Sequence, residues 1–456
     1  MTHARRLAEF VVRASWEDLS AEARGALRAR VLDSLGCALG ALGGEPVRLL
    51  RRHVEEFGGR ERCTLIGGGR TAPDRAALYN SALVRYLDFN DSYLAPRETC
   101  HPSDNLGAVL AATEDAGGRG KELLTALAVA YQVQCRLSDV APVRARGFDH
   151  VTQGAFSVAA GVARALRLDA ERTMNALAIA GTAGNALRVT RTGRLSHWKG
   201  LAFPHAAASA LHAAFLAGQG ITGPAEVFEG NKGWRETVSG PWDLDWSKED
   251  LERVTATDLK KYNAEIHSQA AIEGLLELMG RERIAPVQVQ EIHVAIFDVA
   301  YHIIGGGEEG DKTVVQTKEE ADHSLPYLLA VAALDGTVLP AQYAPARIAS
   351  PDVQALLRRV RVEPDAEYSR RFPGEHACRV TLVTREGRRH AVEKASYEGF
   401  HTTPMSWDTV ERKFRALGRA RAEAAVLDRL VEVVGRLEDA ELCDLLDPLA
   451  RLRAEE

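Results

Sequence analysis

No two of the six cysteines in this 456-residue chain stand close enough to form a Cys-x-x-Cys pair. A zinc ribbon or an iron–sulfur cluster therefore has no local support, because both need clustered thiolates. An aconitase-like mechanism, which holds iron on such a cluster, is disfavoured for the same reason. The pattern fits a reducing compartment, where cysteines are not paired in disulfides.

Long apolar runs are also lacking. The longest uninterrupted stretches, such as YLLAVAAL at 327–334, fall well short of the roughly 20 residues that cross a bilayer. The first residues, MTHARRLAEFVVRASW, are too interrupted by charge for a secretory signal. The 57 basic and 63 acidic residues leave a net charge of −6, which indicates neither a nucleic-acid nor a membrane partner. We expect a cytoplasmic protein.

Two glycine-rich loops lack the residues that would make them nucleotide sites. TLIGGGRTAP at 64–73 and IIGGGEEGDK at 303–312 each contain three consecutive glycines. Neither has the Gly-Lys-Ser/Thr of a P-loop or the dinucleotide-binding spacing after a strand. We interpret both as flexible turns.

Helical periodicity dominates the chain up to about residue 280. Leu27, Val31 and Leu35, for example, mark one face of a helix. The pattern then changes, because VQVQEIHVAIF at 287–297 alternates as a half-buried strand does. RRVRVEP is a further short strand, and HACRVTLVT and RRHAVEKASY, split by REG, predict a hairpin. The helix EEADHSLPYLLAVAAL lies among these strands, and helical periodicity returns from about residue 404.

This order of elements predicts a mainly α fold with a large all-helical domain formed by both chain ends and a smaller α+β domain inserted. The expected bounds are 1–270 for the first part of the helical domain, 271–400 for the inserted domain and 401–456 for the returning helices. The C-terminal helices could instead form a unit of their own.

Acidic residues are missing between Glu171 and Glu226, where the chain average of 63 acids in 456 residues would give about seven. The centre of this stretch, NALRVTRTGRLSHWKGLAF, is basic and contains Arg188, Arg191, Arg194 and Lys199. Cations without a neutralising carboxylate suit an anionic ligand. Buried Ala-rich helices that exclude charge would explain the acid-free helices equally well, but not the basic loop between them.

The segment YLDFNDSYLAPRETCHPSDNL at 86–106 gathers acids and a histidine between two apolar helices. Its acids include Asp88, and its histidine is His101. The pKa of histidine lies near neutrality and a carboxylate can orient the ring, so this pair is a candidate for proton transfer. A lone histidine is more often structural, but one in a Pro-containing acidic loop is harder to dismiss.

Two helix starts carry polar groups that could serve a ligand. In DLKKYNAEIHSQAAIEG, Lys260 and Lys261 precede a helix expected to begin near Asn263, with His267 one turn in. A helix N-terminus beside cations is a ready carboxylate site. Ordinary capping by Asn263 with a surface lysine pair is the simpler explanation of this stretch alone.

The second start is EEADHSLPYLLAVAALDG, where a polar Asp-His-Ser cluster runs into an apolar helix. His323 and Ser324 could cap that helix, and Tyr327 could lie at its entrance. Capping explains the serine but not a tyrosine placed directly after a proline.

Four of these segments resemble the MmgE/PrpD family: LDFNDSYLAPRETCHPSDNLGAVLA, RTGRLSHWKGLA, KYNAEIHSQAAIEG and ADHSLPYLLAVAALDG. The likeness runs in order from near residue 4 to KFRAL at 413–417. It implies a helical domain built from both chain ends with an inserted α+β lid, and a homodimer. It also implies proton abstraction next to a carboxylate, without a metal or other cofactor.

The resemblance also implies site residues. The residues it assigns to catalysis are Asp88, His101, His150, Lys199 and Tyr327. It points to Ser92, Lys261 and His267 as groups that bind the substrate. The basic segments themselves supply the further candidates for substrate binding, Arg191, Arg194 and Lys260.

We expect His101, oriented by Asp88, to be the base, and Lys199 to stabilise the developing enediolate. His150 or Tyr327 would protonate the departing hydroxyl, although base and acid could be reversed. HPSDN and AEIHSQ look most like the 2-methylcitrate dehydratase branch, which predicts metal-independent dehydration of 2-methylcitrate to 2-methyl-aconitate. The alternatives are cis-aconitate decarboxylase or another lyase or epimerase of the family, and a non-catalytic helical protein that binds carboxylates.

Overall fold

The computed structural model describes residues 1–193 and 195–452, which divide into two compact units. The first unit comprises Met1–Arg191, His197–Asp258 and Ser406–Glu456, and the second comprises Thr192–Ser196 and Leu259–Met405. Helices hold 59% of the residues and strands 9%, which confirms the mainly α fold class.

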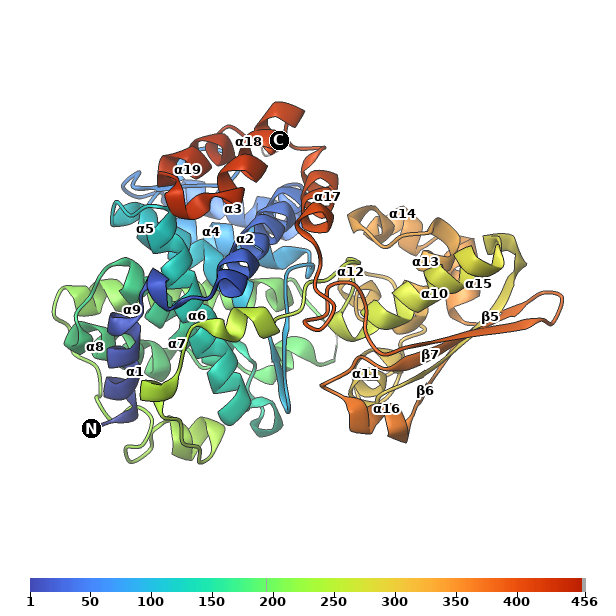
Figure 1. Cartoon of the computed structure of the whole chain (residues 1–456), viewed down its shortest axis with the longest axis horizontal. Helices are drawn as coiled ribbons and strands as arrows, with labels where there is room; N and C mark the ends of the chain where they lie inside the picture. The colour runs from blue at the N-terminus through green and yellow to red at the C-terminus, as the bar shows by residue number, and fades with distance from the viewer. Residues whose placement is uncertain (194, 453–456) are drawn as a thin grey trace. The chain divides into compact units, whose positions relative to one another are not determined.

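Twelve helices of eight or more residues make up most of the described part of the first unit (Figure 1). They are α1 His3–Arg13, α2 Ala21–Ala41, α3 Glu45–Phe57, α4 Pro73–Tyr86, α5 Leu106–Asp115, α6 Gly120–Val140, α7 Val151–Ala165, α8 Ala170–Ala183, α9 Trp198–Gly218, α17 Trp407–Gly418, α18 Ala424–Gly435 and α19 Leu442–Ala450. The C-terminal α17 and α18 pack against α2, so the two ends of the chain share this unit.

Small residues let α7 lie close to its neighbours α6, α8 and α9. A Cβ atom on Gly161 would lie 2.9 Å from a methyl carbon of Val109 and 3.0 Å from the Cβ of Ala130. Any larger side chain at this position would therefore push neighbouring helices apart. The abundance of glycine and alanine in α7 explains why the helix is almost completely buried.

Among the described residues, α9 alone has the length and apolar composition of a membrane span. More than half of that apolar stretch, 56%, is buried inside the protein. The helices α4, α7 and α8 pack against it. A helix of this composition is equally typical of the core of a helical domain.

Four short strands interrupt the helices of the first unit, which the sequence did not predict. β1 (Cys63–Thr64) pairs with β2 (Arg70–Thr71), and β3 (Tyr93–Ala95) pairs with β4 (Glu98–Cys100), both antiparallel. Tyr93 faces Cys100 in the second hairpin. This register brings the residues just outside it, Ser92 and His101, next to each other at the open end.

Lys413 on α17 anchors the loop that follows α4. Its Nζ lies 2.7 Å from an oxygen of Asp33 on α2 and donates a 2.7 Å hydrogen bond to the carbonyl of Phe89. The same ammonium lies 3.7 Å from the centre of the Phe89 ring. The C-terminal part of the chain thus helps to hold the segment that contains Asp88.

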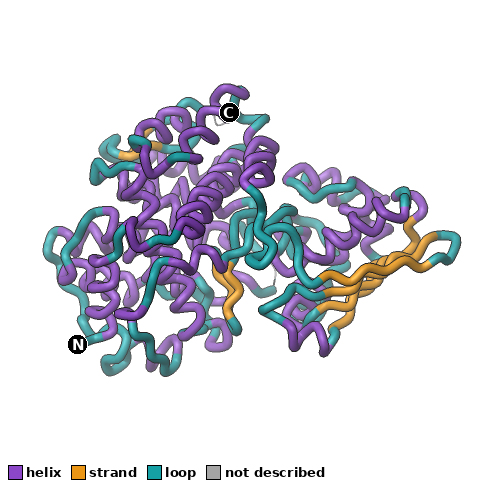
Figure 2. Tube along the Cα trace, in the orientation of Figure 1, coloured by secondary structure: helices purple, strands orange, loops and turns teal. Residues whose placement is uncertain are grey.

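The second unit is built around one four-stranded sheet with the strand order β6-β5-β7-β8. Its strands are β5 Val289–Ile296, β6 Val360–Pro364, β7 Cys378–Thr384 and β8 Arg389–Lys394 (Figure 2). β5 runs parallel to β6 and antiparallel to β7, and β7 and β8 form the predicted hairpin. All four strands were predicted from the sequence.

Helices cover this sheet and connect its strands. They are α10 Gln269–Glu282, α11 Asp298–Ala300, α12 Lys318–Ala321, α13 Leu325–Asp335, α14 Pro345–Ile348, α15 Pro351–Leu357 and α16 Ala366–Arg371. α10 packs against β7, β8 and α13. The single helix expected from EEADHSLPYLLAVAAL is split into α12 and α13, because the Ser324 hydroxyl accepts the backbone N–H of Tyr327 and starts a new helix.

The prediction that a helix begins near Asn263 is wrong, because α10 begins at Gln269. The side-chain oxygen of Gln269 accepts the backbone N–H groups of Lys261 and Tyr262, at 2.9 and 3.0 Å. Its amide nitrogen donates to the carbonyls of Tyr262 and Ala264. One side chain therefore satisfies the backbone of the preceding loop and keeps it from becoming helical. His267 lies in a short 3-10 turn, Ile266–Ser268, instead of one turn inside a helix.

Candidate active site

Asp88 lies at the end of α4 in a conformation that non-glycine residues rarely adopt, with φ at 54°. Arg85, one turn earlier, places Nη1 2.7 Å from Oδ1 of Asp88. Both side chains are buried. Strained backbone of this kind persists where surrounding contacts hold it, and it is concentrated at functional sites.

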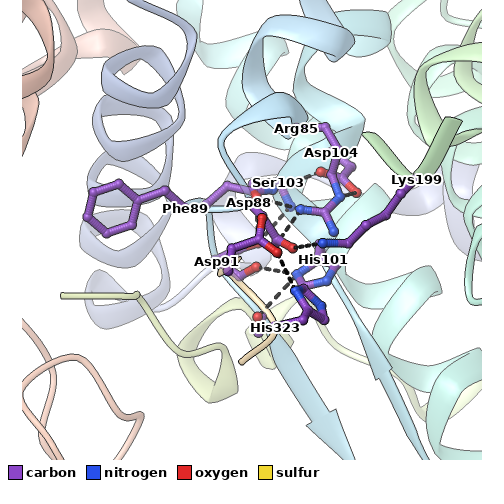
Figure 3. A network of polar contacts seen from close by, with 12 residues as sticks. Arg85, Asp88, Phe89, Asp91, His101, Ser103, Asp104, Lys199 and His323 are labelled. Carbon is purple, nitrogen blue, oxygen red and sulfur yellow. Dashed lines mark hydrogen bonds and ion pairs between the residues drawn. The ribbon is translucent and has the colours of Figure 1, made fainter. Parts of the chain in front are cut away.

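Lys199 in the first turn of α9 supplies a second cation to Asp88. Its Nζ lies 3.4 Å from Oδ2 of the aspartate, and the lysine is 4% exposed. Figure 3 shows Arg85 and Lys199 both pointing toward Asp88. Two buried cations therefore contact this carboxylate, and fixed cations are the groups that a site for an anionic substrate requires.

His101 is held in one orientation by groups on the other side of its hairpin. Its Nδ1 lies 2.8 Å from the carbonyl oxygen of Asp91 and 3.1 Å from Oγ of Ser92. A carbonyl can only accept, so we assign the proton to Nδ1 and the basic lone pair to Nε2. The expected orienting role of Asp88 is therefore taken at Nδ1 by Asp91 and Ser92, because the hairpin register brings these residues beside the ring.

His150 immediately precedes α7 and carries its proton on the same ring nitrogen as His101, but its contact to the protein is made by the other nitrogen. Its Nε2 lies 3.1 Å from Nη2 of Arg191, and a guanidinium can only donate, so the ring proton is on Nδ1. That Nδ1 is buried and has no hydrogen-bond partner among the described residues. Burial lowers the pKa of His150 to about 3, and the charge of Arg191 acts in the same direction against that of Asp149. The ring is therefore neutral at pH 7.

The two imidazoles meet edge to face, with ring centroids 5.2 Å apart. His101 thus offers a basic nitrogen and His150 an N–H group within one buried cluster. Ser92 and Arg191 belong to the same cluster through the contacts given above. Figure 3 draws His101 in one polar network with Asp88 and Lys199. Six of the eleven predicted site residues are therefore gathered in the first unit.

Asp149 is a member of this cluster that the sequence analysis missed. Its Oδ2 lies 2.8 Å from Nε of Arg191 and 3.8 Å from Nη1 of Arg188. Burial alone would raise its pKa, but the Arg191 guanidinium holds it well below the ordinary value. The basic loop is therefore not without a neutralising acid, because an aspartate distant in sequence provides one. The only signal was its position next to His150 in RGFDHVTQG.

Four assigned residues lie in the second unit, and two of them have contacts that argue against the assigned role. Lys261 lies 2.9 Å from both Glu273 and Glu398, so its charge is already compensated. The hydroxyl of the buried Tyr327 donates to the backbone carbonyl of Gln342, which directs its proton into the protein. Their roles in substrate binding and acid catalysis are not supported by these positions.

The other two, Lys260 and His267, keep positions compatible with anion binding. Lys260 is 1% exposed. Nδ1 of His267 lies 2.6 Å from Glu265, while its Nε2 is buried without a hydrogen-bond partner among the described residues. Burial would raise the pKa of Glu265, but His267 and neighbouring cations lower it to about 2. Glu265, which stands between the two in the sequence, was not singled out by motif reasoning.

Residues 5–247 match the model of the MmgE/PrpD N-terminal domain, and residues 262–439 match that of the MmgE/PrpD C-terminal domain. The chain belongs to the MmgE/PrpD family. This confirms the resemblance drawn from its motifs. Arg194, the remaining predicted site residue, lies outside the described residues.

Curated relatives in this family carry out two reactions. The chain is 24% identical to cis-aconitate decarboxylase of Mus musculus over 448 residues, which is 92% of this chain and 88% of the relative. It is 27% identical to 2-methylcitrate dehydratase of Cupriavidus necator over 395 residues, 80% and 78% of the two chains. It is 28% identical to 2-methylcitrate dehydratase of Escherichia coli K12 over 347 residues, 69% and 68%. These similarities support a lyase-type enzyme.

Asp104, in the segment HPSDN at 101–105, lies next to Arg85. Its Oδ2 is 3.5 Å from Nε of Arg85, and its Oδ1 accepts a 2.7 Å hydrogen bond from the side-chain amide of Asn90. Burial raises the pKa of Asp104 to about 7, although Arg85 opposes the shift. Ionising this carboxyl in the folded state therefore costs free energy that the unfolded chain does not require.

This shift predicts a pH-dependent effect of Asp104→Asn. The folded-state pKa is above the unfolded value of 3.8, so the protonated carboxyl's contribution to stability is present at low pH and is lost between about pH 4 and pH 7. The amide of the variant does not ionise, so the variant does not lose this contribution. As the pH rises through this range, its free energy of unfolding should increase relative to that of the unchanged protein by up to about 1.4 kcal/mol per pH unit.

Urea unfolding at pH 5, 6, 7 and 8 measures the gap, which is the difference in the free energy of unfolding between a variant and the unchanged protein. The control is Asp447→Asn on the exposed face of α19, for which the gap should not vary with pH. A gap for Asp104→Asn that stays constant from pH 5 to pH 8 would contradict the prediction.

Proposed function

We propose that the protein is a dehydratase that removes water from 2-methylcitrate to give 2-methyl-aconitate. The observation that carries the proposal is a pair of imidazoles that both carry their proton on Nδ1 but use opposite ring nitrogens for their protein contacts, Nδ1 of His101 to Asp91 and Nε2 of His150 to Arg191. His101 thus keeps a basic Nε2 and His150 an N–H at Nδ1 for the reaction. Elimination next to a carboxylate needs one group that removes a proton and one that assists the departing oxygen. A buried pair 5.2 Å apart meets both needs.

In the proposed reaction, Nε2 of His101 takes the proton from the carbon next to a carboxylate. The electron pair moves into that carboxylate, and the resulting enediolate is stabilised by the ammonium of Lys199. The pair then forms the double bond as the hydroxyl on the neighbouring carbon departs. The products are the alkene and one water, which leaves the charges of the protein unchanged.

The neutral state of His150 decides how that hydroxyl leaves. A neutral imidazole donates a hydrogen bond but does not give up its only ring proton at pH 7. We therefore assign to His150 a hydrogen bond from Nδ1 to the departing oxygen. The proton that turns hydroxide into water is the one that His101 has just removed. This assignment replaces the earlier expectation that His150 or Tyr327 supplies a proton.

The cations of the cluster support a substrate with several carboxylates. Arg85, Arg188, Arg191 and Lys199 outnumber Asp88, Asp104 and Asp149, the acids given above that contact them. Each charge-assisted hydrogen bond contributes about 1.5–3 kcal/mol, and several are needed because carboxylates are costly to desolvate. The segments HPSDN and AEIHSQ favour 2-methylcitrate over other acids, since they look most like the dehydratase branch.

The decarboxylase is the second candidate, because the alignment with the mouse enzyme spans 92% of this chain. Both reactions pass through a carbanion next to a carboxylate and can use the same cations. They differ in which bond breaks, so product analysis separates them.

Proton NMR on EDTA-treated protein with 2-methylcitrate, citrate and cis-aconitate in separate tubes tests the proposal. Dehydration of 2-methylcitrate replaces the methyl doublet with the singlet of a methyl group on a double-bond carbon. Itaconate from cis-aconitate, seen as two vinyl signals, would assign the decarboxylase reaction instead. If no tube changes while the acids still raise the melting temperature, the protein binds carboxylates without this chemistry.

A further inference from the structure

A cleft on the first unit lies apart from the cluster around Asp88 and shares no lining residue with it. It has a volume of about 1380 Å³ and lies between one face of α3, the turn at Gly67–Gly68 and the end of α19. Its volume exceeds the roughly 300–1,000 Å³ typical of small-ligand sites, so it has room for a ligand of nucleotide size.

Arginine dominates the charge of this cleft. Arg48, Arg51 and Arg52 line it from α3, and Arg451 lines it from the end of α19. Within the part of the chain that the structure describes, no acid pairs with Arg48, Arg52 or Arg451. The acids in the lining are Glu45 and Glu55, so arginine exceeds acid there.

Two details of α3 favour an anionic ligand. Arg48 and Arg52 stand four residues apart, where like charges on a helix repel. Arg51 pairs through Nε with Glu55 at 2.5 Å and lies over the ring of Tyr79, 5.5 Å from its centre, so its guanidinium is held in place at the cleft.

The triglycine loop at 67–69 shapes the opposite wall. All three glycines have left-handed φ values of 94°, 105° and 83°. A Cβ on Gly69 would lie 3.3 Å from Nη2 of Arg51, and one on Gly68 would lie 3.4 Å from the carbonyl oxygen of Ala450. The loop, which the sequence analysis interpreted as a flexible turn, therefore allows the close approach that brings Arg51 and Arg451 to one cleft.

We propose that this cleft binds a polyanion with two or more phosphate or carboxylate groups, at a site separate from the one that binds the reacting substrate. Guanidinium groups pair with both kinds of anion through two parallel hydrogen bonds, so the arginines fix the chemistry but not the source. A polyanion bound in this cleft places negative charge beside the guanidinium of Arg51 and relieves the repulsion between Arg48 and Arg52.

Isothermal titration with inorganic tripolyphosphate and, separately, with citrate tests the proposal. The variant is Arg48→Ala/Arg52→Ala, and the matched control is Arg429→Ala/Arg436→Ala, whose arginines already pair with acids. We expect one tripolyphosphate per chain, at least tenfold weaker binding in the first variant and no change in the control. Citrate binding that the first variant weakens equally would identify carboxylates as ligands too.

Three results would overturn the proposal. They are the absence of saturable binding by either anion, equal losses in both double variants, and loss of tripolyphosphate binding in Lys199→Ala, which impairs the reaction site but leaves the cleft intact. Retained tripolyphosphate binding in that variant supports a separate site whether or not 2-methylcitrate proves to be the substrate.

Discussion

His101→Ala is expected to lower kcat by about two to four orders of magnitude, the range found when a general base is removed. The reason is that the hydrogen bond from Nδ1 to Asp91 leaves Nε2 as the basic nitrogen of the ring. His150 cannot replace it, because the low pKa of this ring, about 3, makes it a weak base. Initial rates of product formation by NMR measure the effect.

His101→Asn separates the loss of basicity from the loss of structure. Its side-chain amide can still donate to the Asp91 carbonyl but has no basic nitrogen, so it should be as inactive as the alanine variant. His212→Ala, which removes an exposed histidine of α9, is the control and should leave kcat unchanged. If His101→Asn retains a tenth or more of the activity, His101 is not the base.

Lys413→Met is expected to lower the free energy of unfolding by about 3–5 kcal/mol, because it leaves a buried charge without its partner. Asp33 is 1% exposed and lies 2.7 Å from the lysine. Burial already raises the pKa of Asp33, and Lys413 provides the main opposing interaction. Chemical unfolding in urea measures the loss.

A double-mutant cycle identifies the cause. Asp33→Asn/Lys413→Met removes the unpaired charge and should recover part of the stability lost in Lys413→Met. Lys121→Met on the exposed surface of α6 is the control, with an expected change within about 0.5 kcal/mol. An equal loss in the single and double variants would mean that the packing of the lysine, rather than its charge, matters here.

The sequence was sufficient for elements whose pattern is local. β5, β7 and β8 alternate along their own length, so period and turn residues located them. The start of α10 was misplaced because the deciding contact comes from Gln269, a side chain beyond the loop it organises. β3 and β4 are three residues each, too short for any alternation to show.

The same distinction applies to the candidate site. Asp88 and His101 stand in one motif, so their proximity followed from the sequence. The contact of Arg191 with Asp149 joins residues 42 positions apart, and no pattern along the chain reports such a pair. The protonation patterns of His101 and His150 also could not be predicted, because each depends on which neighbour can only accept or only donate a hydrogen bond.

The anchor between Lys413 and the Phe89 carbonyl also affects how the protein is made. The two residues are separated by 324 positions, so a ribosome adding about 5–20 residues per second needs about 16 to 65 s to synthesise the interval. For most of that time Asp33 lacks its counter-ion and the loop that contains Phe89 lacks its anchor. The nascent chain therefore carries an incomplete candidate site until α17 has been synthesised, and activity should appear only after that helix.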